Sequence, residues 1–382
     1  MMTGSDVAPG RVRRDRRPRL DPASGSSPMA RALQLAAQVR TATAPNPWVG
    51  CVLVSRSGEV FEGATEPPGG PHAEVVAIGR AGEEARGSVL YTTLEPCAHQ
   101  GRTPPCTGAI VAAGVSKVVV GILDPDPQVC GRGVEELRDR GVEVEVGEMA
   151  EEVSAQLAPY LKHRRTGRPW VILKLGASAD GRIAAPDGSS RWITGEAARR
   201  DAHRLRAESD AVLVGAGTVR VDDPSLTARD GSQVVAEPLR VVLGSVPRGA
   251  KVRPALEMRG DPGGVLDDLG ARGVLQVLVE GGSQVAHRFH EAGVVDRYVL
   301  YLAPALFGGD DAVPMFRGAG APDMARIWRG RFVSMEPLGS DLRLELEAVG
   351  AEVPAGLDAL IGSSSNMPAG EDARTQPDQE EV

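Results

Sequence analysis

The sequence contains few cysteines, few aromatic residues and no long uninterrupted apolar run. No run reaches the roughly 18 to 20 residues that a membrane-spanning helix requires, so we predict no membrane partner. Only four cysteines occur, Cys51, Cys97, Cys106 and Cys130, and no apolar signal segment precedes them. This argues against a disulfide framework and predicts a reducing compartment, the cytoplasm. A net charge of -8 and an aromatic content of 3% argue against nucleic acid as a partner.

Length and composition indicate two globular domains. The chain has 382 residues, of which 42% are hydrophobic, and about 150 residues per domain is usual. Residues 1–28 are rich in Arg, Pro, Ser and Gly, and residues 351–382 in Ser, Pro, Gly and acids, so we expect a disordered arm and a disordered tail. The basic, turn-rich stretch Lys162–Pro169 has the composition of a linker. We therefore predict a first domain over residues 29–165 and a second over 169–350.

Both domains are predicted to be layered α/β structures. In the first, helical patterns at 29–41, from His72, after Cys106 and around 134–137 alternate with apolar strands at 49–54, 89–92, 117–121 and 142–146. In the second, strands at 171–175, 211–214, 239–243 and 274–279 are separated in the same way.

The strongest chemical signal is a set of zinc ligands. His72 is followed by Cys97, which comes after a proline, and by Cys106. One imidazole and two thiolates leave a fourth tetrahedral position open for water, as a catalytic zinc requires. Glu74, two residues after the histidine, is placed to act as the general acid and base. The pattern is that of zinc deaminases, with a longer insert between the two cysteines.

Two simpler interpretations of these residues stay open. The cysteines and the histidine can form a closed structural zinc site, for which His99 is the nearby candidate for a fourth ligand, or the cysteines can be buried thiols that bind no metal. Cys51 and Cys130 lie outside the ligand spacing, and Cys51, within an apolar strand, is expected to serve as a small hydrophobic residue.

The motifs of the first domain resemble those of the bifunctional deaminase/reductase family of riboflavin biosynthesis. The similar segments are Pro45–Gly50, Pro71–Glu74, Thr93–His99, Gly101–Cys106 and Asp124–Pro127. The resemblance implies a cytidine-deaminase-like α/β/α domain in which zinc is bound by His72, Cys97 and Cys106, with Glu74 as the proton shuttle.

The resemblance continues through the second domain, which it implies to be an α/β domain like dihydrofolate reductase. The similar segments are Lys174–Arg182, Ser190–Thr194, Val214–Val219, Asp222–Thr227 and Val279–Gly282. By position, the resemblance implies NADPH contacts at Gly176, Trp192, Thr218, Asp222, Ser245 and Gly282. It implies substrate contacts at Ser190, Arg206, Leu226, Arg229 and Glu280.

The resemblance also implies the reaction and the assembly. The substrate would be a phosphorylated pyrimidine, which is first deaminated and then reduced by NADPH at its ribose, and the chain would form a homo-oligomer. Lys174 and Asp222 are hypothetical helpers at the sugar carbonyl, because both are polar residues within the similar segments.

Two features depart from the family pattern. Thr65 stands where members usually have a histidine, seven residues before His72, so one secondary contact of the deaminase pocket is in question. The stretch Val246–Val265 also looks shorter than the family pattern, as if part of a cofactor wall were trimmed.

Two rival functions can be distinguished from this one. The chain can instead deaminate another base or nucleoside, with a second domain that is catalytically weak. It can also be a zinc-stabilised binding protein without activity, although such a protein would not need Glu74.

Overall fold

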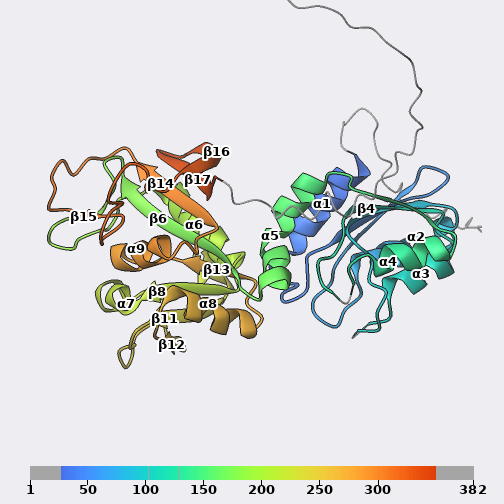
Figure 1. Ribbon diagram of the computed structural model, residues 1–382, viewed down its shortest axis with the longest axis horizontal. Coiled ribbons are helices and arrows are strands. Elements are labelled where there is room, and N and C mark those ends of the chain that lie inside the picture. Colours follow the sequence, from blue (N-terminus) through green and yellow to red (C-terminus); the bar gives the residue numbers. More distant parts are fainter. Residues whose placement is uncertain (1–26, 102, 128, 350–382) are drawn as a thin grey trace, which may run out of the picture.

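The computed structural model describes residues 27–101, 103–127 and 129–349. The predicted disordered arm, except for its last two residues, and the whole predicted tail lie outside these residues. Two sheets with flanking helices lie side by side along the long axis, and helix α5 (Ala150–Thr166) lies between them (Figure 1). No helix in the described part of the chain is long and apolar enough to cross a membrane.

The first sheet has five strands in the order β2-β1-β3-β4-β5. Strand β1 is antiparallel to both of its neighbours, whereas β3, β4 and β5 are mutually parallel. Consequently every strand except β1 runs in the same direction, and their carboxyl ends share one edge. The strands are β1 (Gly50–Val54), β2 (Val60–Ala64), β3 (Val89–Leu94), β4 (Lys117–Ile122) and β5 (Glu143–Val146).

Helices cover both faces of this sheet. One face is covered by α1 (Pro28–Val39) and α5, and the other by α2 (Ala73–Ala81), α3 (Cys106–Ala113) and α4 (Arg132–Asp139); a short 3-10 helix, Gly82–Ala85, follows α2.

Two glycines in the strands allow the helices to approach the sheet closely. A Cβ atom at Gly50 would lie 1.9 Å from the carbonyl oxygen of Ala32 in α1, and one at Gly63 would lie 2.1 Å from that of Ala73 in α2.

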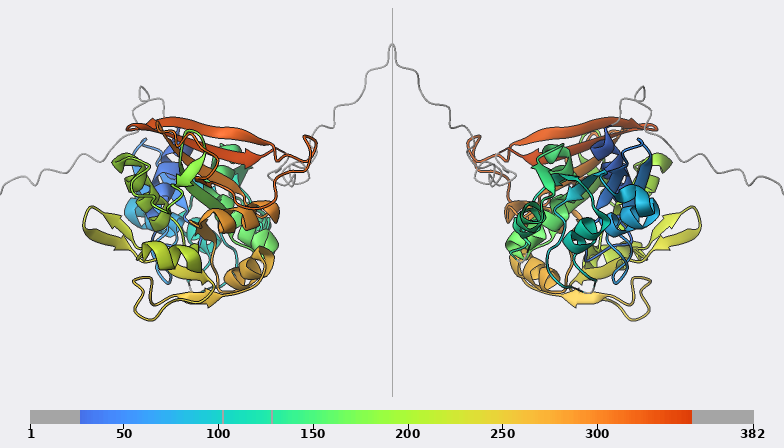
Figure 2. Two further views of the ribbon diagram at one scale, coloured as in Figure 1. Left: turned by 90° about the vertical axis from the view of Figure 1, so that its left-hand side faces the viewer. Right: turned by 90° about the vertical axis from the view of Figure 1, so that its right-hand side faces the viewer.

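The second sheet has eight strands in the order β12-β11-β8-β13-β6-β14-β17-β16. The first six are parallel, and β17 and β16 extend the sheet in antiparallel fashion along the edge that Figure 2 shows clearly. Their bounds are β6 (Trp170–Ser178), β8 (Ala211–Gly215), β11 (Leu239–Leu243), β12 (Leu256–Met258), β13 (Gln276–Val279), β14 (Arg297–Ala303), β16 (Gly330–Leu338) and β17 (Asp341–Ala348).

Two apolar clusters line the faces of this sheet. On one face α6 (Glu196–Ala207) and α7 (Ala216–Asp222) pack, and on the other α8 (Pro262–Ala271) and α9 (Ser283–Glu291). Short antiparallel pairs complete the domain: β7 (Arg182–Ala184) with β15 (Val313–Pro314), and β9 (Ala228–Asp230) with β10 (Gln233–Ala236). Both predicted α/β domains are thus confirmed as mixed α/β structures.

Most of the stretch Lys162–Pro169 is helical and not a flexible linker, because α5 continues to Thr166. Basic residues in its last turn suit the negative end of the helix dipole, and Gly167, with a φ of 72°, ends the helix. Lys162 also forms an ion pair with Asp296 at 2.5 Å. Composition alone suggested a linker, but these tertiary contacts make most of the stretch a packed helix.

The stretch Val246–Val265 is not devoid of regular structure. It contains the three-residue edge strand β12 and the first turn of α8, whose N-cap, Asp261, accepts a hydrogen bond from the amide of Gly264. Its shortness relative to the family stays a prediction.

Alanine substitutions at Gly50 and at Gly79 should change the stability of the protein in opposite directions. Gly50→Ala forces backbone atoms of α1 away from β1, and such overpacking costs about 1–3 kcal/mol. Gly79→Ala, at an exposed position of α2 where a Cβ meets nothing within 4 Å, is expected to stabilise by roughly 0.5–1 kcal/mol. Calorimetric unfolding midpoints of the zinc-loaded proteins check this, and an unchanged midpoint for Gly50→Ala would contradict it.

Candidate functional site

The predicted zinc ligands converge at the carboxyl edge of the first sheet. His72 is the N-cap of α2, which follows β2; Cys97 lies beyond the end of β3, and Cys106 begins α3. The Nδ1 atom of His72 lies 3.2 Å from Sγ of Cys106 and 3.6 Å from Sγ of Cys97, and the two sulfur atoms are 3.6 Å apart. Among the described residues this is the one His, Cys, Asp or Glu cluster with metal-ligand spacing.

The geometry and chemistry of this cluster fit zinc. Zinc bonds of about 2.0–2.3 Å place tetrahedral ligand atoms roughly 3.5 Å apart, close to the spacing of these three atoms. The other ring nitrogen of His72, Nε2, lies 3.4 Å from Oγ1 of Thr103, which leaves Nδ1 for the metal. Hydrogen bonding between Cys97 and Cys106 lowers the pKa of Cys97, so a thiolate forms readily there. His99 is exposed and outside the cluster, so the closed site is not supported.

Glu74 lies in the first turn of α2, against the ligands. Its side chain is buried, and Oε2 is 3.7 Å from Sγ of Cys106. Burial raises the pKa of Glu74 to about 7, which lets the carboxyl group accept and release a proton near neutral pH. Cys51, on β1, is fully buried in the core, and Cys130 is exposed outside the cluster.

Glu95 holds the loop that carries Cys97, and sequence reasoning assigned it no role. Its buried carboxylate accepts hydrogen bonds at 2.9–3.3 Å from four backbone amides, those of Asp124, Gly131, Gly133 and Val134. These bonds attach the loop after β3 to the end of β4 and the start of α4. The available signal was an acidic residue placed between a buried strand and the Pro-Cys pair.

Thr65, where the family resemblance predicted a histidine, forms hydrogen bonds with the backbone. It is buried, and its hydroxyl accepts a hydrogen bond from the amide of Val49 at 3.1 Å. The hydroxyl therefore joins the end of β2 to the start of β1.

The predicted cofactor residues of the second domain lie along the carboxyl edge of its parallel strands. Thr218 follows β8 and Gly282 follows β13, and a Cβ at Gly282 would lie 3.4 Å from Oγ1 of Thr218. Gly176 in β6 faces Thr194 in the loop that carries Trp192.

The loop with Trp192 reaches the end of α7. Arg191 donates a hydrogen bond to the carbonyl oxygen of Asp222 at 2.9 Å. Trp192 is 70% exposed, with the Arg199 guanidinium 4.4 Å from its ring centroid, so it is not a core residue. Ser245 lies after β11, where its hydroxyl accepts a hydrogen bond from Arg259. Within the described chain, no hydrogen bond joins Ser245 or the half-buried Ser190 to the other predicted residues.

A buried ion pair joins two of the predicted substrate residues. Arg206 on α6 donates two hydrogen bonds of 2.7 Å to Glu280, which follows β13, and Nζ of Lys174 lies 4.0 Å from the same carboxylate. Burial alone would raise the pKa of Glu280, but the charges of Arg206 and Lys174 lower it to about 2. This carboxylate is therefore ionised at physiological pH.

Two further predicted substrate residues, Leu226 and Arg229, lie next to Thr227 in the sequence or in space. Arg206 donates to the carbonyl oxygen of Thr227 at 3.3 Å, and Nε of the exposed Arg229 donates to its hydroxyl at 3.0 Å. Leu226 has a φ of 55° and a buried side chain that packs in the core. Any contact of Leu226 with a substrate would therefore involve its backbone.

One face of α6 contributes more to this site than the sequence reasoning recognised. Arg199, His203 and Arg206 follow one another at helical spacing, and Nδ1 of His203 accepts a hydrogen bond from the amide of Arg229 at 3.1 Å. Basic residues at i, i+4 and i+7 on one helix were the signal for this row.

Comparisons with known proteins agree with both halves of the chain. A family model described as the cytidine and deoxycytidylate deaminase zinc-binding region matches residues 24–122. A second, described as the RibD C-terminal domain, matches residues 169–344.

Curated relatives match most of the chain. The riboflavin biosynthesis protein RibD of Mycobacterium tuberculosis is 44% identical over 331 residues, which cover 84% of this chain and 96% of that protein. RibD of Escherichia coli is 39% identical and covers 83% of this chain and 98% of that protein.

Solved structures show the same arrangement. Acinetobacter baumannii RibD superposes with a TM-score of 0.79 at 38% identity, covering 84% of this chain and 98% of that one. A Thermotoga maritima diaminohydroxyphosphoribosylaminopyrimidine deaminase/5-amino-6-(5-phosphoribosylamino)uracil reductase superposes with a TM-score of 0.76 at 34% identity, with the same coverage. With the zinc-type ligand cluster and the two α/β domains, these matches show that the chain belongs to the RibD family of riboflavin biosynthesis enzymes, which combine a deaminase with a reductase.

Proposed function

We propose that the chain deaminates 2,5-diamino-6-(5-phosphoribosylamino)pyrimidin-4(3H)-one and then reduces the product, 5-amino-6-(5-phosphoribosylamino)uracil, with NADPH. In the first step water replaces the ring amino group, which leaves as ammonia. In the second step a hydride and a proton convert the ribosyl group into a ribityl chain. The contact of the buried Glu74 carboxyl with the His72, Cys97 and Cys106 cluster supports the first step most directly.

In the deaminase domain, His72, Cys97 and Cys106 would hold the metal. Zinc bound by three ligands supplies an activated water near neutral pH. Glu74 accepts a proton and passes it to the departing amino group, for which a pKa of about 7 is well suited. Glu95 positions Cys97 through the backbone hydrogen bonds that it accepts.

In the reductase domain, we propose that Gly176, Trp192, Thr218, Asp222, Ser245 and Gly282 would hold NADPH, which would supply the hydride. The N-terminus of α9, which begins after Gly282, offers free backbone amides to a phosphate group. We propose Ser190, Arg206, Leu226, Arg229 and Glu280 as the substrate contacts. The exposed guanidinium of Arg229 suits the substrate phosphate, and the ionised Glu280 carboxylate suits ribose hydroxyl groups. Lys174 and Asp222 stay hypothetical helpers at the sugar carbonyl.

We further propose domain boundaries of 29–165 and 169–350, a cytoplasmic location and a homo-oligomeric assembly that binds neither nucleic acid nor membrane. The apolar side chains that edge strand β16 exposes, Phe332 and Met335 among them, support self-association.

Replacing the proposed proton shuttle should abolish deamination alone. Glu74→Gln removes the titrating group, so ammonia release should fall by about 10²–10⁴-fold. Zinc content and NADPH oxidation with the deaminated substrate should stay unchanged. Glu83→Gln, an exposed control in the short 3-10 helix that follows α2, should behave like the wild type. Deamination retained in Glu74→Gln would rule out the assigned role.

Zinc content provides a second test, independent of turnover. We expect about one zinc per chain, a much weaker hold on zinc in Cys97→Ser, and wild-type zinc content in the control Cys130→Ser. Metal analysis after dialysis against a chelator measures this. Equal zinc retention in the two variants would show that Cys97 is not a ligand.

The ion pair of the second domain can be tested without removing its charge. Arg206→Lys keeps a cation beside Glu280 but loses the paired hydrogen bonds, so kcat/KM of the reductase should fall by about tenfold or more, with deamination unaffected. Arg200→Lys, on the exposed side of the same helix, is the matched control. Steady-state NADPH oxidation with the deaminated substrate measures both, and equal values would refute a role for the pair.

A further inference from the structure

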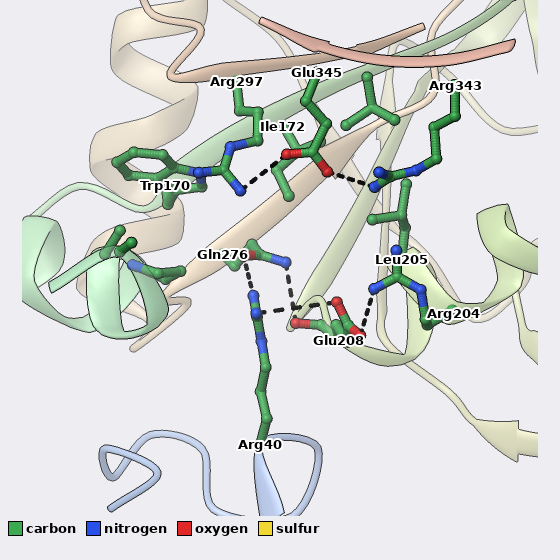
Figure 3. A pocket seen from close by; sticks show the side chains of 14 residues that line it. Arg40, Trp170, Ile172, Arg204, Leu205, Glu208, Gln276, Arg297, Arg343 and Glu345 are labelled. Atoms are coloured by element: carbon green, nitrogen blue, oxygen red, sulfur yellow. Dashed lines mark hydrogen bonds and ion pairs between the residues drawn. The ribbon is translucent and has the colours of Figure 1, made fainter. Parts of the chain in front are cut away.

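The two domains meet at the amino-terminal edge of the second sheet, opposite the edge that carries the proposed reductase site. Strands β6, β13 and β14 begin there, at Trp170, Gln276 and Arg297. Residues of both domains line a cavity of about 130 Å³ at this junction (Figure 3). The first domain contributes α5 residues and one charged side chain, that of Arg40 at the end of α1.

Arg40 contacts three separate parts of the molecule. Its Nη2 donates a hydrogen bond to Oε1 of Gln276 at 2.6 Å, and its Nη1 lies 4.0 Å from Oε2 of Glu208. Its guanidinium carbon lies 5.0 Å from the ring centroid of Trp48, in the segment that leads into β1 of the first domain. The side chain therefore extends from the deaminase domain to two elements of the reductase domain.

The side chain of Gln276, the first residue of β13, connects this strand to the end of α6. It is 2% exposed, and its Nε2 donates to the carbonyl oxygen of Glu208 at 3.1 Å and to Oγ of Ser209 at 3.0 Å. The preceding residue, Leu275, packs in the apolar core of the first domain. The amide nitrogen of Gln276 donates within the reductase domain, and its amide oxygen accepts from Arg40. Together these bonds fix the orientation of the amide group.

The two elements that Arg40 contacts, β13 and α6, also carry the ion pair of the reductase site. Glu280 follows β13, four residues after Gln276 and therefore about 13 Å along a fully buried strand. Arg206 lies two residues before Glu208 at the end of α6. The segments that Arg40 contacts thus carry Arg206 and Glu280, the two partners of the 2.7 Å ion pair.

We propose that Arg40 is a positioning residue for the reductase site, supplied by the deaminase domain. By holding the start of β13 and the end of α6 together, it sets the relative position of Glu280 and Arg206. The proposal rests on the proposed assignment of these two residues to the reductase substrate. The deaminase domain, on this view, completes the geometry of the second active site.

The first test compares Arg40→Ala with Arg31→Ala in the full-length, zinc-loaded protein. Arg31 lies on the same helix, but its ion pair with Glu62 stays within the first domain. Arg40→Ala should raise the KM for 5-amino-6-(5-phosphoribosylamino)uracil by about fivefold or more, the size expected for a lost contact between neighbouring groups. The KM for NADPH and the rate of ammonia release should change by less than about twofold, and Arg31→Ala should change none of the three.

Two further variants test whether Arg40 acts through Gln276. Arg40→Lys keeps a charged donor and should restore part of the lost affinity. In a Gln276→Ala background, Arg40→Ala should raise the KM by clearly less than it does alone, because the shared contact is already lost. Full additivity of the two substitutions would overturn the proposed route.

Amide hydrogen exchange supplies a readout that does not need turnover. Exchange over residues 276–283 should be faster in Arg40→Ala and unchanged in Arg31→Ala. Unchanged exchange together with an unchanged KM would overturn the proposal and leave the proposed function intact. If exchange is faster in Arg40→Ala but the wild-type protein itself does not oxidise NADPH, the positioning role of Arg40 is supported and the proposed function is contradicted.

Discussion

Strand direction is the constraint on which both sites depend. In the first sheet β2, β3 and β4 run the same way, and in the second sheet β6, β8, β11 and β13 do so. Loops after parallel strands therefore gather at one edge, and helices begin there with unpaired backbone amides. His72 and Cys106 stand at the starts of α2 and α3, where these amides favour thiolate and carboxylate groups, and Gly282 stands at the start of α9.

Two buried carboxyl groups give the sites their different chemistry. Glu74 has no buried arginine or lysine partner among its described contacts, so burial dominates and raises its pKa to about 7. Glu280 is also largely removed from solvent, but Arg206 and Lys174 lower its pKa to about 2 from a usual 4.5. The stability that this lowered pKa contributes is present above pH 4.5 or so and is lost as the pH falls towards 2. The first group can move a proton near neutral pH, whereas the second remains a fixed negative charge.

Local patterns predicted the α/β layers, because these depend on periodicity. The zinc ligands were predicted because their residue types and spacing form a recognisable motif. Contacts between distant segments were not predictable in the same way. Glu95 binds amides that lie up to 39 residues away, and Arg40 and Gln276 are separated by 236 residues. The helical state of Lys162–Thr166 depends likewise on packing against the second domain. The antiparallel extension of the second sheet by β16 and β17 also went unrecognised. Its outer strand, β16, is mostly exposed and lacks the burial that marks a core strand.

The central claim, that one chain carries out both reactions in order, can be tested in a single vessel. The purified, zinc-loaded protein would receive the diaminopyrimidinone ribosylamino phosphate and NADPH, while ammonia and NADPH are followed together. The account predicts that ammonia appears first and that NADPH is then oxidised in equal amount. Neither signal from a folded, zinc-loaded sample would contradict the substrate assignment, and ammonia without NADPH oxidation would contradict the proposed role of the second domain.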